Sequence, residues 1–320
     1  MRHKGSFLFM FFCLALLLSG CEPLMVLDPK GPVAKIQSDT IIFSMWVMAG
    51  VLFVVYVLFV YMLVKYRATK ANEGYVPPHE EGSKLLEIAW TAIPIVIVVI
   101  LSVITVKTLD QVENKPAGYD DQKPMIIYAS SSNWKWHFSY PEENIETVNY
   151  LNIPTNRPIE FRLYSYGPIT SFWIPQLGGQ KYAMSDMVTK LHFAADHPGS
   201  FMGKNSNFSG RGFAQMEFEV LAMSPADYSK WVDEVKKTAP ELTEPEFDSV
   251  LDMEHVGRKT YSSTHLSFRP APEGAHGGHN HGGGTTTESE PHSTSEHSGH
   301  SDSSSEHSEH SEMNHDQHKK

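Results

Sequence analysis

The sequence predicts a membrane protein in which a hairpin of two transmembrane helices precedes an all-β sandwich. Residues 41–64 and 88–107 are nearly uninterrupted apolar runs, and each is close to the ~20 residues that a helix needs to span a bilayer. Residues 125–222 instead show short runs of alternating apolar and polar residues, separated by turn residues. Roughly one hundred residues with this pattern are typical of a β-sandwich.

A targeting segment occupies residues 1–20. Two basic residues precede the apolar run Phe7–Leu18, which is too short to span a bilayer. Leu18-Ser19-Gly20-Cys21 then matches a bacterial lipoprotein signal. We expect cleavage before Cys21, a diacylglycerol group on its thiol, and an extracytoplasmic segment over residues 21–40. The alternative is an ordinary signal peptide with an incidental Cys21. Cys13 would leave with the signal, so no disulfide is expected.

The loop between the two spans, residues 65–87, sets their orientation. Its basic residues are Lys65, Arg67, Lys70 and Lys84. Basic residues concentrate in cytoplasmic loops, so the hairpin is predicted to place everything after Lys107 outside the cytoplasm. The alternative, two buried helices of a soluble protein, does not fit runs this long and this free of charge.

The predicted sandwich covers residues 108–222. Its candidate strands are Met125–Ala129, Trp134–Tyr140, Ile159–Tyr164, Val188–Phe193 and Met216–Leu221. The histidines of this region, at positions 137, 192 and 197, lack the spacing of a metal site, so we interpret them as structural residues.

The most distinctive stretch is Gly203–Met216, which reads GKNSNFSGRGFAQM. Its composition predicts a loop between strands. Gly203, Gly210 and Gly212 can adopt positive φ and would let the chain fold back tightly. The stretch contains neither Cys nor His.

Together with upstream motifs, this loop resembles subunit II of the haem–copper respiratory oxidases. Those motifs are Ser171-Phe172-Trp173-Ile174-Pro175, Leu177-Gly178-Gly179 and Pro198-Gly199. The resemblance runs from about residue 38 to about residue 270. It implies that the sandwich is cupredoxin-like.

In the cytochrome c oxidases of that family, this loop holds a dinuclear copper centre. On the present chain the two thiolate positions fall on Asn205 and Ser209, the Glu position on Asn207, the two imidazole positions on Phe213 and Thr170, and the Met position on Met216. Only the Met keeps the family's residue. Copper of this kind needs thiolate, imidazole or thioether ligands. The resemblance therefore implies the quinol-oxidising branch, which lacks this centre.

Two further stretches resemble this family. Trp134–Phe138 is similar to the aromatic stretch beside the copper, and here we expect it to pack in the core or contact the catalytic subunit. Glu87-x-x-Trp90-Thr91-x-x-Pro94 resembles the start of the second helix, where the Glu is associated with the mouth of a proton path. A carboxylate at a helix N-terminus is also favourable against the helix dipole, and both interpretations of Glu87 stay open.

Residues 223–272 are predicted to form a helical extension. Ser224-Pro225-Ala226-Asp227 supplies an N-cap, a proline at the first position and an early acid, which predicts a helix to about Lys237. Thr243–Met253 predicts a second short helix. Quinol-oxidising members of the family carry a comparable extension, and we expect it to lie across the partner subunit.

Residues 273–320 lack hydrophobic periodicity and are predicted to be disordered. They carry nine Asp/Glu and two Lys, a charge of 2 − 9 = −7 out of the chain's −11. The acidic balance argues against nucleic acid as a partner. Ten of the seventeen histidines lie here, including His276, His279 and His281. Histidine-rich tracts bind divalent metals, so a weak tail metal site is a hypothesis beside that of a merely solvated tail.

We interpret the chain as subunit II of a membrane quinol oxidase that reduces O2 to water and pumps protons. The haems and the O2-reducing copper would belong to subunit I, and this chain is expected to bind no cofactor itself. Its expected partners are subunit I, the other oxidase subunits, membrane quinol and membrane lipid. Two alternatives remain. One is a cytochrome c oxidase subunit, which the absent thiolates disfavour, and the other is a membrane-tethered metal-binding or copper-delivery protein that uses the histidine-rich tail.

We predict that the mature protein begins at Cys21 and carries lipid, because a basic region, an apolar run and Leu-Ser-Gly-Cys follow one another in order. The intact mass of the membrane form should lack residues 1–20 and include acyl groups. Cys21→Ala should abolish the acyl mass, whereas Cys13→Ala should leave it unchanged. An unmodified Cys21, or another start residue, contradicts the prediction.

Overall fold

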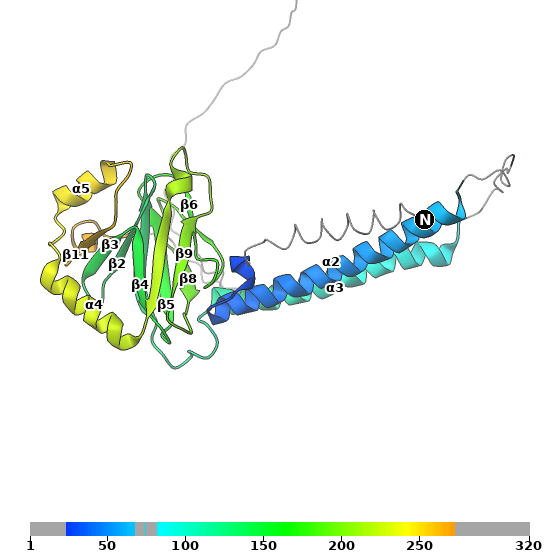
Figure 1. The fold of residues 1–320 in the computed structure, drawn as a ribbon, viewed down its shortest axis with the longest axis horizontal. Coiled ribbons are helices and arrows are strands. Elements are labelled where there is room, and N and C mark those ends of the chain that lie inside the picture. Colours follow the sequence, from blue (N-terminus) through cyan, green and yellow to red (C-terminus); the bar gives the residue numbers. More distant parts are fainter. Residues whose placement is uncertain (1–23, 68–73, 75–81, 273–320) are drawn as a thin grey trace, which may run out of the picture. The chain divides into compact units, whose positions relative to one another are not determined.

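The computed structural model describes residues 24–67, residue 74 and residues 82–272. Two long helices lead into two β-sheets, and two shorter helices follow (Figure 1). Cys13, Cys21 and the tail histidines, for which the sequence makes predictions, lie outside the described residues.

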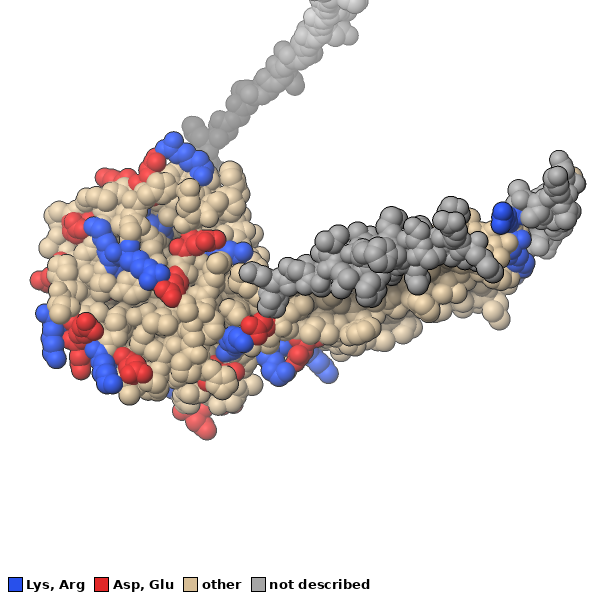
Figure 2. Space-filling view, in the orientation of Figure 1, with Lys and Arg blue, Asp and Glu red and all other residues tan. Residues whose placement is uncertain are grey.

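The two long helices are α2, Pro32–Lys65, and α3, Lys84–Glu113. They pack against each other, and Thr40 Oγ1 lies 3.3 Å from Thr108 Oγ1 across the pair. Both are longer than the predicted spans 41–64 and 88–107, because polar turns continue the helices beyond their apolar parts. Figure 2 shows an uncharged surface along the visible part of the two helices, with charged residues at their ends. Pro94 lies inside α3, which continues on both sides of it.

The strands form a two-layered sandwich. A six-stranded sheet has the order β11-β3-β2-β1-β5-β8, and a five-stranded sheet has the order β4-β10-β9-β6-β7. The strands are β1 Met125–Ser132, β2 Lys135–Tyr140, β3 Ile145–Val148, β4 Tyr150–Pro154, β5 Ile159–Ser165, β6 Thr170–Trp173, β7 Lys181–Ala183, β8 Thr189–Phe193, β9 Gly199–Asn205, β10 Glu217–Met223 and β11 Lys259–Tyr261. Most pairings are antiparallel, but β1 with β5 and β4 with β10 run parallel.

The five predicted strands correspond to β1, β2, β5, β8 and β10. Strands β3, β4, β6, β7, β9 and β11 were not predicted from the sequence. Several of these have only three to five residues, which is too short for alternation to stand out from a loop. β9 was missed for another reason: it includes Gly199 and Gly203, which favour a loop by composition.

Aromatic rings from both sheets fill the core between the layers. Phe172 of β6 stacks on Phe218 of β10 with ring centroids 5.4 Å apart, and Trp136 of β2 meets Phe172 edge to face at 5.2 Å. Trp136 and Phe138 are fully buried, so these members of the predicted aromatic stretch pack in the core. Such aromatic pairs add specific contacts to the burial of large apolar surfaces.

The extension contains α4, Pro225–Thr238, and α5, Glu244–Asp252, with Ser224 and Thr243 as their N-caps. Both predicted helices are therefore present. The prediction that residues 223–272 form a helical extension was incomplete, however. Lys259–Tyr261 forms strand β11, which pairs with β3. The extension packs on the sandwich of its own chain (Figure 1). Contact with a partner subunit stays a prediction.

Candidate functional site

The loop that aligns with a copper site begins inside the five-stranded sheet. Gly203 and Asn205 belong to β9, and a short 3₁₀ helix, Phe213–Gln215, leads into β10. Of the three glycines, only Gly210 has a positive φ, of 113°. Glycine is needed at the other two positions for a different reason. A Cβ at position 203 would collide with the ring of Phe218, and a Cβ at position 212 would collide with the ring of Trp134.

Asn205 is the centre of this loop. Its Oδ1 accepts hydrogen bonds from the backbone N of Ser171 at 2.8 Å and of Asn207 at 3.0 Å. Its Nδ2 donates to Ser209 Oγ at 2.9 Å. The side chains at the two positions that align with thiolates are thus hydrogen-bonded directly to each other. The loop is held by side-chain hydrogen bonds of the kind that compete with regular structure.

The remaining aligned positions are divided between this network and the core. Asn207 Nδ2 donates to the carbonyl of Ile169 at 2.9 Å, next to Thr170. Thr170 Oγ1 lies 2.7 Å from Ser131 Oγ, and both hydroxyls are buried. Phe213 packs edge to face on Phe208 with centroids 5.3 Å apart. Met216 is only 1% exposed and belongs to the hydrophobic core.

This donor set does not fit a dinuclear copper centre. Asn205, Asn207, Ser209 and Thr170 offer neutral amide and hydroxyl groups, and each is engaged in a hydrogen bond. Copper of this type selects thiolate and imidazole ligands. Within the described ranges, no group of three or more His, Cys, Asp and Glu residues is arranged to hold a metal ion.

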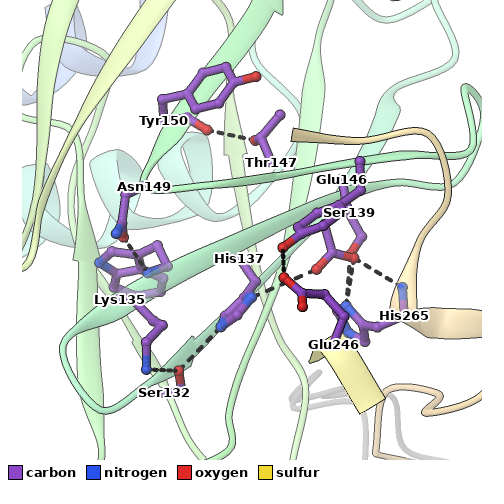
Figure 3. Close-up of polar contacts among 12 residues, drawn as sticks. Ser132, Lys135, His137, Ser139, Glu146, Thr147, Asn149, Tyr150, Glu246 and His265 are labelled. Atoms are coloured by element: carbon purple, nitrogen blue, oxygen red, sulfur yellow. Dashed lines mark hydrogen bonds and ion pairs between the residues drawn. The ribbon is translucent and has the colours of Figure 1, made fainter. Parts of the chain in front are cut away.

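A second polar site was not found from the sequence. It consists of Ser132, His137, Ser139, Glu146, Tyr164 and His265, which we call the Glu146 cluster (Figure 3). It lies on the side of the six-stranded sheet that faces away from the core, beneath the extension. Alternation along β2 and β3 predicts a solvent-facing polar side there, but Glu146, His137 and His265 are 0% exposed.

The Glu146 carboxylate accepts several hydrogen bonds at one oxygen. Its Oε2 accepts from His265 Nδ1 at 2.7 Å, from the backbone N of His265 at 3.0 Å and from Ser139 Oγ at 2.8 Å. Its Oε1 lies 3.7 Å from His137 Nδ1, which is too far for a hydrogen bond. On the far side of the cluster, His265 Nε2 and the Tyr164 hydroxyl are 2.7 Å apart.

Burial and charge act in opposite directions on this carboxylate. Burial by itself raises the pKa of Glu146, but the attraction to His265, the hydrogen bond from its ring and the nearby imidazole of His137 outweigh this effect. The pKa of Glu146 therefore lies well below its usual range, and the carboxylate stays ionised. Burial lowers the pKa of His137, although the neighbouring carboxylate opposes this effect. His137 is accordingly neutral at pH 7.

The other residues singled out from the sequence lie apart from both sites. Glu87 is in the first turn of α3, where it is exposed and its backbone N bonds to the carbonyl of Ser83 at 3.0 Å. His192 is half-buried on β8 and His197 is exposed. Cys21 and the tail residues His276, His279 and His281 fall in the stretches that the structure does not describe.

Comparison with known proteins finds related chains. Residues 28–108 match the family "Cytochrome C oxidase subunit II, transmembrane domain". Quinol oxidase subunit 2 of Bacillus cereus is 50% identical over 80% of this chain and 88% of its own length. The Bacillus subtilis protein of the same name is 48% identical over 78% of each chain.

Among solved structures, the periplasmic domain of subunit II of cytochrome oxidase from Bradyrhizobium japonicum is similar. It is 22% identical, with a TM-score of 0.34, over 35% of this chain and 94% of that one.

We predict that Asn205→Ala lowers the free energy of unfolding by about 1 to 3 kcal/mol, because it leaves the buried N–H of Ser171 without an acceptor. Guanidinium unfolding of the detergent-solubilised protein, followed by tryptophan fluorescence, measures the change. Gln215→Ala, an exposed change in the same loop, should stay within about 0.5 kcal/mol of the unmodified protein. Equal effects of the two substitutions would show that Asn205 does not hold the loop.

Proposed function

The chain belongs to the quinol oxidase subunit 2 family, whose members are subunits II of haem–copper oxidases, and from this membership we propose how it works in its complex. The complex oxidises a membrane quinol, reduces O2 to water and moves protons outward. The haems and the O2-reducing copper reside in subunit I. This chain binds no redox cofactor and contributes a membrane anchor and an outer domain that covers subunit I.

The loop around Asn205 carries this proposal. An electron-accepting copper centre would require thiolates at positions 205 and 209, where an amide and a hydroxyl bond to each other instead. Electrons from quinol therefore reach subunit I without passing through this chain. The same observation disfavours the cytochrome c oxidase alternative.

Three finer parts of the proposal rest on the sequence. Lipid on Cys21 tethers the mature N-terminus to the outer leaflet, as the signal motif supports. The basic loop 65–87 keeps the connection between the helices in the cytoplasm. The histidine-rich tail, with His276, His279 and His281, is a weak metal-binding segment without a part in electron transfer.

We predict that the purified complex lacks a copper centre in this subunit. It should oxidise quinol but not reduced cytochrome c, and it should show no near-infrared absorption from a dinuclear centre. Metal analysis is made on a complex lacking residues 273–320, because ten tail histidines could bind stray copper. Two additional copper ions per complex, together with cytochrome c oxidation, would contradict the proposal.

A variant of the same chain serves as the positive control for that measurement. Combining Thr170→His, Asn205→Cys, Asn207→Glu, Ser209→Cys and Phe213→His restores the aligned donor set around Met216. After copper is added, this variant should gain the near-infrared absorption that the natural chain lacks. The control shows that the assay detects such a centre when the donors are present.

Glu87 supplies a further prediction for the assembled complex. If its carboxylate feeds protons to subunit I, Glu87→Gln should lower quinol oxidase turnover about tenfold, equivalent to about 1.4 kcal/mol in the barrier. Asp110→Asn, at the opposite end of α3, is the matched control and should leave turnover unchanged. Unchanged turnover in Glu87→Gln would leave only its favourable position at the helix N-terminus.

A further inference from the structure

The segment after α4 covers a polar surface rather than an apolar one. Lys135, His137 and Ser139 alternate along β2 on the side away from the core, and all three are 0% exposed. The apolar cluster beneath this segment is small, with Val148, Leu242, Phe247 and Tyr261 as its buried members. In contrast, α4 packs on the main core. We call residues 241–272 the cover segment.

Glu146 contributes two of the four hydrogen bonds between the sandwich and His265, near the end of the cover segment, and Ser139 and Tyr164 contribute the others. His265 donates to Glu146 Oε2 through both its ring and its backbone N, at 2.7 and 3.0 Å. The ring of Phe247, from α5, stacks on His265 with centroids 4.4 Å apart and contacts His137 edge to face at 5.3 Å. His137 and Glu146 are therefore enclosed only while the cover segment is in place.

From this arrangement we propose that the Glu146–His265 bond is a latch for the cover segment, and that His137 makes the latch open in acid. Under the proposed function the latch faces the compartment into which the complex moves protons. It would then respond to the turnover of the complex itself. The latch rests only on contacts within this chain, so it stands or falls independently of the quinol assignment.

The direction of the pH effect follows from burial. In the closed state, burial lowers the pKa of His137, and its partners hold the pKa of Glu146 low. Opening hydrates both side chains and returns them toward ordinary values, near pH 6.5 for histidine. Below about pH 6.5 the open state binds the additional proton, so closure is favoured above that pH and weakens as the pH falls. One coupled proton changes the opening equilibrium by up to about tenfold per pH unit.

Lys135 and two tyrosines of the sandwich also lie close to the latch. Lys135 donates to the carbonyl of Leu251 in α5 at 3.2 Å, and burial lowers its pKa to about 8. Burial raises the pKa of Tyr164 and brings that of Tyr166 to about 12.

The remaining charged groups belong to the cover segment itself. Arg269 lies over the Phe247 ring and pairs with Asp248 at 2.7 Å. Glu246 bonds to Lys259 and Tyr261, which lower its pKa below its usual value. Asp252 faces Lys135. Two further histidines belong to the cover segment: His265 in the latch and the exposed His255, which stacks on Trp134. The variant His137→Gln separates the response of His137 from theirs.

Hydrogen–deuterium exchange of the full chain in its complex tests the latch. Protection of residues 241–272 is measured from pH 7.5 to pH 5 and corrected for the intrinsic exchange rate. Peptides from β9 and β10 provide the internal reference. Relative to that reference, protection of the cover segment should fall about tenfold between pH 6.5 and pH 5. A constant ratio across this range overturns the proposal.

Two variants separate the bond from the pH response. His137→Gln should abolish the decline between pH 6.5 and 5, whatever its effect on absolute protection. Its matched control is His192→Gln, which removes another partly buried histidine of the same sheet and should keep the natural slope. If protection of the cover segment in His137→Gln falls between pH 6.5 and 5 as steeply as in the natural chain, the proposal is wrong.

Glu146→Gln tests the bond. It should reduce protection of the cover segment at pH 7.5 at least tenfold while sparing β9 and β10. Glu142→Gln, which removes only a partly exposed pair with Arg157, is its control and should have no such effect. Protection within twofold of the natural chain overturns the latch. If Glu146→Gln also unfolds β9 and β10, the proposal is tested instead by the pH dependence of cover-segment protection in His137→Gln.

Discussion

A buried polar group costs free energy unless it is paired inside the protein, and this constraint shapes both polar sites of the domain. An unpaired buried donor or acceptor costs about 1 to 3 kcal/mol. In the loop, Asn205 meets the requirement with an amide that accepts two backbone N–H groups and donates to Ser209. Under the cover segment, Glu146 meets it with bonds from His265 and Ser139.

The loop that aligns with a copper site is held by side-chain hydrogen bonds. Its glycines still allow close approach to the rings of Phe218 and Trp134. Met216 still lies at the aligned position, but it is buried in the core. The hydrogen bonds of Asn205 hold the backbone of the loop in place.

The cover segment forms a further layer over the side of the six-stranded sheet that faces away from the core. It adds β11 to the edge of the six-stranded sheet and so closes an edge that would otherwise expose unpaired backbone groups. Its apolar contacts are few compared with those of the main core. Local opening begins where such contacts are sparse. The proposed latch between Glu146 and His265 lies within this layer.

The sequence by itself determined the membrane hairpin, the sandwich, both C-terminal helices and the loss of the copper ligands. These features are local: apolar length, alternation, N-caps and residue identity at aligned positions. The strands β3 and β11 were not evident, because each is too short to show a period. The role of Gly203 and Gly212 was not evident either, because it depends on the rings of Phe218 in β10 and of Trp134 in the turn between β1 and β2.

Only the tertiary structure decided that His137 and Glu146 are buried. Their alternation along β2 and β3 is that of a solvent-facing side. A segment more than one hundred residues further along the chain covers that side and brings His265 onto the carboxylate, a pairing with a sequence separation of 119. Local pattern carries no information about contacts of that range, because burial depends on what packs above a strand as well as on the strand itself.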